Sequence, residues 1–97
     1  MRMMMTVQVP NEAGSRAIND GTLPKVLGEL HDRLRPEATY FFATDGHRTA
    51  QFVFDMKDSS EIPPLAEPLF QQLNAAVTLL PVMNLDELQK GLGALQR

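Results

Sequence analysis

The sequence predicts one α+β domain, in which a four-stranded antiparallel sheet carries helices on one of its faces. Three observations predict this class. Four short stretches are rich in apolar, aromatic and β-branched residues, three segments repeat leucine and other apolar residues with the period of a helix, and an Asp45-Gly46 dipeptide separates two of the strands. With 97 residues the chain has room for one core, so we treat residues 1–97 as a single domain.

The chain begins with a strand followed by a helix. Residues 2–9 are short and apolar and end at Pro10, which is typical of a buried strand. A helix opens after this strand, with Asn11 as a suitable N-cap. Gly21 interrupts the helical pattern, so we expect two helical segments instead of one.

The second helical segment has the clearer amphipathic pattern. Thr22 can cap it, and Pro24 falls in its first turn, where the missing N–H costs little. Its apolar residues recur at positions i, i+3, i+4, i+7 and i+11, which places them on one helical face. These residues are Leu23, Val26, Leu27, Leu30 and Leu34.

Two strands joined by a tight turn form the centre of the chain. We expect strands over residues 37–44 and 47–56, because Asp45-Gly46 is a favoured type I′ hairpin turn. A two-residue turn fixes the register of the hairpin. The predicted pairs are Thr44 with His47, Phe42 with Thr49, and Tyr40 with Gln51.

The last part of the chain predicts helix, strand and helix. Residues 62–73 keep a helical apolar period in spite of three prolines, residues 75–83 are strand-like, and Asn84 caps a final helix. The apolar stripe of that helix consists of Leu85, Leu88, Leu92 and Leu95. The resulting order β-α-β-β-α-β-α is the ferredoxin-like βαββαβ order with an added C-terminal helix.

Alternation along the strands predicts two unlike faces of the sheet. One set of positions is apolar and should meet the helices: Met3, Met5, Val7, Val9, Phe41, Ala43, Ala50, Phe52 and Phe54. The other set mixes rings, amides and hydroxyls: Met4, Thr6, Gln8, Tyr40, Phe42, His47, Thr49, Gln51, Val53, Asp55, Thr78 and Leu80. This mixed face carries too much apolar surface to be left exposed to water, and too many polar groups to be buried without hydrogen-bond partners. We therefore expect it to be a homodimer interface, a ligand site or both.

Composition excludes several classes of function. The net charge is −3 and no Lys/Arg cluster exists, so nucleic acid is not an expected partner. No run is long enough to span a membrane, and the apolar start is interrupted too early for a signal peptide. Cysteine is absent, which removes disulfides and thiolate sites and is compatible with the cytoplasm, where we expect the protein to act.

The order of elements resembles the dimeric α/β-barrel superfamily, in which two ferredoxin-like sheets pack face to face. Within it, the segments "VPNEAGSRAINDGTLP", "TDGHRTAQFVFDM" and "PVMNLDELQKGL" resemble a branch of small bacterial proteins with no assigned activity. The resemblance implies a homodimer with a pocket between the sheet and helices of each subunit. The superfamily includes cofactor-free monooxygenases, heme-degrading enzymes and lactone isomerases, so it does not select a function. Their catalytic residue sets find no match here, and the chain has no Trp.

Six residues on the mixed face are the candidate ligand-binding set: Thr6, Gln8, Tyr40, His47, Gln51 and Asp55. Tyr40 and Gln51 should be directly opposite, either orienting a polar-headed ligand or pairing across strands at a dimer contact. His47 beside the turn is either a solvated histidine or a general base. The two histidines, His31 and His47, lack metal-ligand spacing, so we expect no metal and no cofactor.

These residues leave three classes of function open. The leading hypothesis is a small homodimer that binds a small apolar or aromatic ligand between sheet and helices. The alternative is a small enzyme of the barrel superfamily, an isomerase or a cofactor-independent monooxygenase. A purely structural module would need only the interface. Whether a reaction is catalysed stays open at this point.

Overall fold

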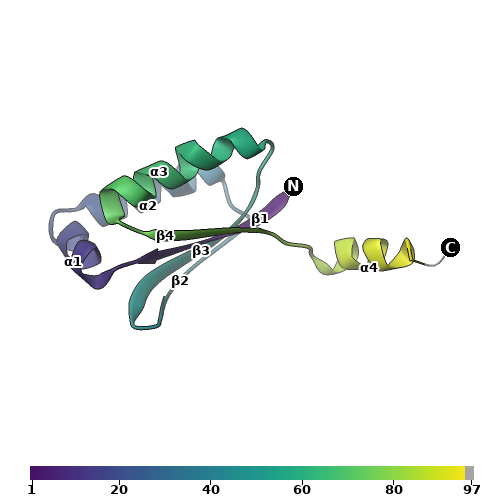
Figure 1. Ribbon diagram of the computed structural model, residues 1–97, viewed down its shortest axis with the longest axis horizontal. Helices are drawn as coiled ribbons and strands as arrows, with labels where there is room; N and C mark the ends of the chain where they lie inside the picture. Colours follow the sequence, from purple (N-terminus) through teal and green to yellow (C-terminus); the bar gives the residue numbers. More distant parts are fainter. Residues whose placement is uncertain (96–97) are drawn as a thin grey trace.

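The computed structural model describes residues 1–95, which contain four strands and four α-helices (Figure 1). The strands are β1 (Arg2–Val9), β2 (Ala38–Thr44), β3 (His47–Asp55) and β4 (Ala76–Pro81). The helices are α1 (Asn11–Asn19), α2 (Thr22–Leu34), α3 (Ile62–Leu73) and α4 (Leu85–Gly93), and a short 3₁₀ helix, η1 (Ser59–Glu61), precedes α3. This is the predicted order of elements, with the first helical region divided into α1 and α2.

The four strands form one open antiparallel sheet in the spatial order β2-β3-β1-β4. The fold is therefore α+β, and this strand order is compatible with a ferredoxin-like arrangement. Helices α2 and α3 lie across one face of the sheet, and the opposite face carries no helix of the same chain in the described residues (Figure 1). β2 and β4 are the two edge strands.

The β2–β3 hairpin has the predicted register, with Tyr40 paired to Gln51. The turn residues Asp45 and Gly46 both have positive φ angles, 54° and 75°. Positive φ at both central positions is the requirement of a type I′ turn, whose twist matches that of the flanking strands. The side-chain amide of Asn11 donates a hydrogen bond to the carbonyl of Gly46 at 3.0 Å, which ties the start of α1 to the turn.

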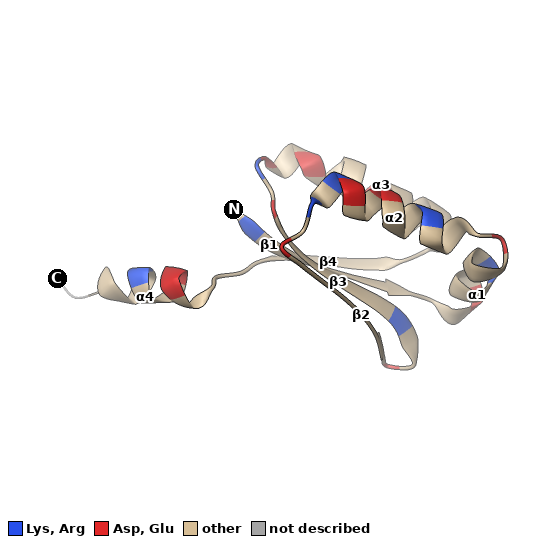
Figure 2. Cartoon of the chain, turned by 180° about the vertical axis from the view of Figure 1, so that it is seen from behind, with Lys and Arg blue, Asp and Glu red and all other residues tan. Residues whose placement is uncertain are grey.

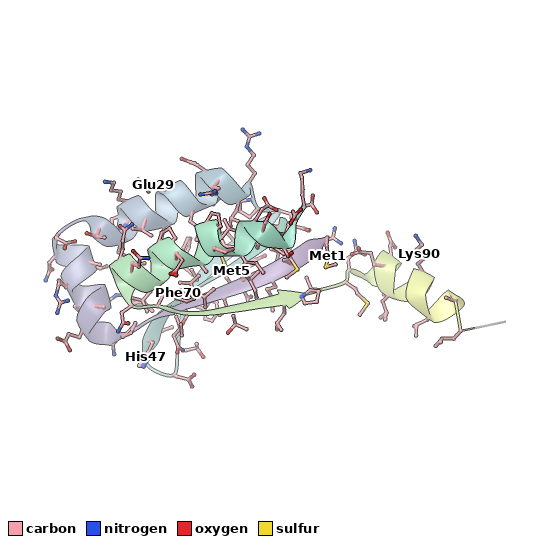
Figure 3. The ribbon with its side chains drawn as sticks, turned by 45° about the horizontal axis from the view of Figure 1, so that its top comes forward. Met1, Met5, Glu29, His47, Phe70 and Lys90 are labelled. Atoms are coloured by element: carbon pink, nitrogen blue, oxygen red, sulfur yellow. The ribbon has the colours of Figure 1, made fainter. Side chains whose placement is uncertain are left out.

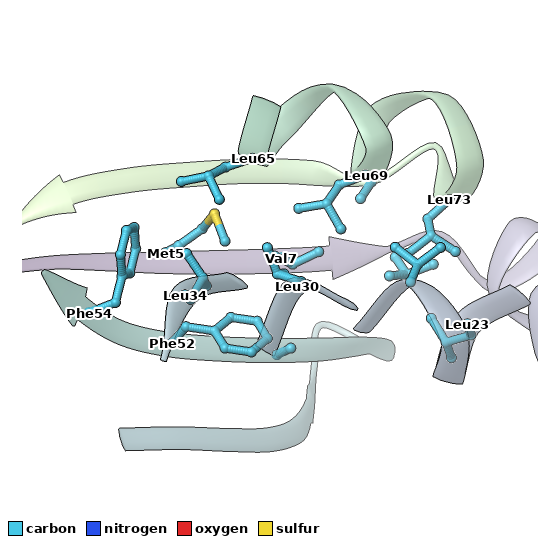
Figure 4. Packing of buried hydrophobic residues seen from close by; sticks show 14 of the residues in the cluster. Met5, Val7, Leu23, Leu30, Leu34, Phe52, Phe54, Leu65, Leu69 and Leu73 are labelled. Atoms are coloured by element: carbon cyan, nitrogen blue, oxygen red, sulfur yellow. The ribbon is translucent and has the colours of Figure 1, made fainter. Parts of the chain in front are cut away.

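The core lies between the sheet and helices α2 and α3 (Figure 4). Met5, Val7 and Phe52 contribute the central layer from the sheet, and each has 0% of its surface exposed. Leu69 and Leu73 of α3 close over this layer from above. Removing one large buried side chain from such a core typically costs about 3–5 kcal/mol. The predicted core positions of β1 and β3 are therefore confirmed.

The first residues of α1 and α2 differ from the predicted caps. Pro10 precedes α1, and Asn11 is already its first helical residue. Gly21 occupies the cap position of α2 with φ 81°, and the backbone N–H of Thr22 donates to the carboxylate of Asp20 at 2.9 Å. The predicted caps were wrong by one residue, because the left-handed turn between the helices suits glycine and places the helix start directly after it.

Helix α3 forms in spite of its prolines, as the apolar period predicted. Pro63 and Pro64 lie in its first turn, and Pro68 lies inside the helix. Four of the six stripe positions are buried, namely Leu65, Ala66, Leu69 and Leu73. The other two, Ile62 and Phe70, are partly exposed at the outer edge of the helix. Burial of one helical face therefore outweighs the backbone cost of the prolines.

Two predicted core residues on β2 are not buried. Phe41 and Ala43 point to the same side as Phe52, but Phe41 has 63% of its surface exposed and Ala43 is also exposed. The reason is the position of β2 at the edge of the sheet, outside the area that α2 and α3 cover. The helix side of β2 therefore presents apolar surface that no element of the described chain covers.

Helix α4 projects from the body of the protein (Figure 1). It begins with the predicted cap: the side chain of Asn84 accepts from the N–H of Glu87 at 2.8 Å, and Glu87 accepts from the N–H of Asn84 at 2.9 Å. An ion pair from Arg2 to Glu87 links it to the sheet. None of its side chains is buried. The projection raises the radius of gyration to 15.5 Å, compared with about 13 Å for a compact domain of this length.

Charged residues lie mainly on the helices, where acidic and basic side chains are interspersed, whereas the strands carry few of them (Figure 2). Within residues 1–95, no helix combines the length and the apolar character that crossing a bilayer requires.

Candidate functional site

A row of polar side chains crosses the open face of the sheet. Tyr40, Gln51, Thr6 and Thr78 are successive partners on β2, β3, β1 and β4. The amide of Gln51 donates to the hydroxyl of Thr6 at 3.3 Å. Three of the six candidate residues are therefore brought together, in the register that the turn predicted.

Apolar side chains flank this polar row. Phe42 lies on one side of it, and Met4, Val53 and Leu80 lie on the other, where they form a second row across three strands. Phe42 has 41% of its surface exposed and Leu80 49%. The open face is thus a broad, partly apolar surface with a polar strip across it, and large exposed surfaces of this kind mark interaction sites.

His47 and Gln8 lie at the hairpin end of the open face. Figure 3 shows His47 at the end of the molecule opposite to the projecting α4. The Nδ1 atom of His47 is buried and has no hydrogen-bond partner among the described residues. The amide of Gln8 is 3.5 Å from the carbonyl of Thr44, a long hydrogen bond. Among the described residues, His47 therefore has no hydrogen-bonded partner that would orient it as a general base, and Gln8 makes only this long hydrogen bond.

Asp55 lies far from the other candidates. It ends β3 and accepts a hydrogen bond from the N-terminal ammonium of Met1 at 2.7 Å, and Lys57 lies 3.6 Å away. The hydrogen bond and the charge of the N-terminal ammonium lower the pKa of Asp55. His47 and Asp55 stand eight positions apart on one strand, about 26 Å at roughly 3.3 Å per residue. The structure does not bring them to one site.

The main apolar cavity of the described chain lies on the other side of the sheet, at the hairpin end. It has a volume of about 410 Å³. β1 and α2 form one part of its wall with Val7, Val9, Leu23 and Leu27. The β2–β3 hairpin forms the other part through the side chains of Phe41, Ala43 and Ala50, and Phe42, whose side chain lies on the open face, also borders the cavity. The cavity exists because no helix of the described chain covers the helix side of β2, where Phe41 and Ala43 are exposed.

Arg48 and Thr49 complete the lining, but the side chain of Thr49 lies on the open face, in register with Phe42 and Gln8. Thr49 is buried, and its hydroxyl donates to the carbonyl of His47 at 3.1 Å, so its hydrogen-bonding donor is used within the hairpin. Arg48 pairs with Val9 and Ala43 in the register, which places its side chain on the helix side. The cavity therefore combines an apolar wall with one cationic side chain.

Sequence reasoning missed Arg48 and placed the candidate residues on the opposite face. A signal was present, because Arg48 occupies an inward position of β3, in phase with Ala50, Phe52 and Phe54. A charged side chain at an inward-facing strand position lies either at the border of the core or in the wall of a cavity. The strand pattern alone does not say which, since the answer depends on where α1 and α2 lie.

Besides a small hollow of about 90 Å³ between α2 and α3, two larger ones lie elsewhere on the surface of the described chain. One, of about 320 Å³, is formed by α3 and the edge strand β4 and is apolar, with Phe70 and Leu79 in its wall. The other, of about 300 Å³, is lined by charged groups where Arg2 meets Glu37 and Glu87. Residues 1–95 contain no cluster of three or more His, Cys, Asp or Glu side chains that could hold a metal ion.

Comparison with known proteins adds no assignment. No protein-family model matches the chain, and no curated protein matches it.

Proposed function

We propose that this protein is a small homodimer that binds a small apolar or aromatic molecule in the cavity between its sheet and α2. The observation that carries the proposal is the cavity of about 410 Å³ at the hairpin end. Its volume lies within the range of about 300–1,000 Å³ that is common for small-molecule pockets. Such pockets are mostly apolar with a few polar groups, which describes this lining.

Phe41 supports the ligand part of the proposal. Its ring is exposed, yet it stands edge-on to the buried ring of Phe52, with the ring centroids 6.2 Å apart. An aromatic side chain at this place contributes little to the core of the free chain. A flat apolar molecule between Phe41 and Leu27 of α2 would cover the ring and extend the core to the edge strand.

The open face supports the homodimer part. The polar row from Tyr40 to Thr78 can satisfy its hydrogen bonds across a two-fold axis, and the flanking Phe42 and Leu80 can bury their side chains against the second copy. A sheet-to-sheet contact would be isologous, because the same patch serves both subunits. Two such chains would form the dimeric α/β barrel that the order of elements resembles.

Helix α4 supports the same conclusion. A nine-residue helix is shorter than the roughly 12–15 residues at which isolated helices become stable in water. Its leucines at positions 85, 88 and 92 are exposed in the single chain. In the proposed dimer this apolar stripe lies against the partner, where burial stabilises the helix.

The ligand proposal is tested by calorimetry with naphthalene-2-carboxamide, an uncharged bicyclic probe. Ala43 is exposed on the edge strand β2 and lines the cavity, so Ala43→Trp should fill the cavity without disturbing the core. Gln71 is exposed on α3 and does not line this cavity, so Gln71→Trp is the matched control. We expect the wild type and the control to bind the probe, and Ala43→Trp to lose binding.

Two results would contradict the ligand proposal. One is the absence of binding to the wild type at millimolar probe. The other is equal binding by Ala43→Trp and the wild type, which would place the probe elsewhere.

A further inference from the structure

Arg48 is a cation without a carboxylate partner at the wall of an apolar cavity. Among residues 1–95, the ion pairs are formed by Arg2, Arg16, Lys57 and the N-terminal ammonium, and none involves Arg48. The one hydrogen bond of its guanidinium in this part of the chain goes from Nη2 to the hydroxyl of Ser15, at 3.4 Å. A guanidinium has five N–H donors, so most of them are left for another acceptor.

The protein makes room for this guanidinium at α1. A Cβ atom added to Gly14 would lie 2.8 Å from Nη1 of Arg48, a distance that real Cβ contacts do not reach. Gly14 has ordinary helical backbone and needs no positive φ, so its lack of a side chain serves the close approach of Arg48. The position of the guanidinium is thus set by the packing of α1 against β3.

The surroundings of Arg48 favour an anion. Gly14 and Ser15, the two residues of α1 that the guanidinium approaches, lie in the middle of the helix and carry no charge. The nearest acidic residue on that helix, Glu12, pairs with Arg16 at 3.3 Å and is largely exposed. The planar fork of an arginine matches the two oxygens of a carboxylate, which makes a bidentate contact available.

We propose that the cavity takes an aromatic carboxylate, with its ring between Phe41 and α2 and its carboxylate on Arg48. This inference rests on the proposed function, because it names the ligand class of the same cavity. The apolar wall supplies affinity for the ring, and the single cation supplies the preference for an acid. A neutral molecule of the same shape would leave the guanidinium without a charged partner.

The test compares two probes of the same shape by calorimetry at low salt: naphthalene-2-carboxylate and naphthalene-2-carboxamide. We expect the wild type to bind the carboxylate at least tenfold more tightly than the amide. Arg48→Gln should lower the carboxylate affinity at least tenfold and remove the difference in affinity between the two probes. Gly14→Ala should act in the same direction, because its methyl group displaces the guanidinium.

The possible results distinguish the preference for a carboxylate from the proposed binding of a ligand in the cavity. If the wild type binds both probes equally, the cavity binds ligands but the preference for an acid is wrong. If Arg48→Gln keeps the preference, another group recognises the carboxylate and the assignment to Arg48 is overturned. If neither probe binds, the proposed function and this inference fail together. The wild-type comparison requires no variant to fold, so it decides the preference by itself.

Discussion

The ring of Phe41 stands edge-on to the ring of Phe52, with an interplanar angle of 89°, although Phe41 is exposed and Phe52 is fully buried. This pair marks the border between the closed core and the open cavity. Phe52 belongs to the central strand beneath the helices, whereas Phe41 belongs to the edge strand that they leave uncovered.

Phe41→Ala should separate binding from stability. Aromatic pairs contribute about 0.5–1.5 kcal/mol beyond the area that they bury, so the variant should lose roughly 1 kcal/mol of unfolding free energy. Its affinity for naphthalene-2-carboxamide should fall at least tenfold, because one wall of the cavity is gone. Phe52→Ala, as the comparison, should lose about 3–5 kcal/mol. Urea unfolding and calorimetry give the two quantities, and an unchanged affinity in Phe41→Ala would remove Phe41 from the site.

Gly46→Ala should destabilise the hairpin. Gly46 has φ 75° in a turn with open space around it, so the cost comes from the backbone and not from a clash. The left-handed conformation costs a non-glycine residue about 1–2 kcal/mol. Gly28 is the matched control, since it lies inside α2 with open space around it. There alanine should stabilise the protein by about 0.5–1 kcal/mol. Urea unfolding should show a lower unfolding free energy for Gly46→Ala and a higher one for Gly28→Ala. A change in the same direction in both variants would contradict the turn assignment.

The link between Asp55 and the N-terminal ammonium should depend on pH. The pKa of Asp55 is lowered in the folded chain by this ammonium. A lowered folded-state pKa contributes stability above the unfolded value of about 3.9, and that contribution is lost as the pH falls through the folded-state pKa. In an untagged chain, Asp55→Asn should therefore lower the melting temperature at pH 7. The difference from the wild type should shrink as the pH falls below about 4, whereas a constant difference would show that the carboxylate charge is not involved.

Leu80→Asp should weaken the homodimer. Leu80 lies exposed on the open face, and a dimer contact there would bury an unpaired charge in the variant, typically at a cost of several kcal/mol. Ile62→Asp is the control, because Ile62 is partly exposed on α3, on the other side of the sheet. Sedimentation velocity at micromolar concentration should show a dimer for the wild type and the control, and monomer for Leu80→Asp.

A chain that ends at Met83 tests the contribution of α4. Since no side chain of α4 is buried in the single chain, the truncated protein should keep the fold and dimerise more weakly. If the wild-type protein sediments only as a monomer, neither the open face of the sheet nor α4 forms a dimer contact.

Local rules predicted much of this fold. Asp45-Gly46 fixed the hairpin register, because a type I′ turn admits one pairing of its flanking strands. The apolar period predicted α3 through three prolines, since burial of Leu69 and Leu73 needs the helix. The register depends on residues that are close in sequence, and the prediction of α3 depends on the apolar period of a single helical face.

The cavity could not be predicted in the same way. Alternation assigns Phe41 to the helix side, but only the lateral position of α2 decides whether a helix covers it. The place of Arg48 likewise depends on the packing of α1, where Gly14 leaves room for the guanidinium. The candidate residues on the open face, Tyr40 and Gln51, were paired correctly, but they lie on the other side of the sheet from the cavity.

Nuclear Overhauser contacts between bound naphthalene-2-carboxylate and methyl groups of the protein would show directly where the ligand lies. Binding in the cavity between sheet and helix predicts contacts from the ring protons to the methyl groups of Val9, Leu23 and Leu27. Contacts to Met4, Val53 and Leu80 instead would place the ligand on the open face and contradict the assignment of the cavity.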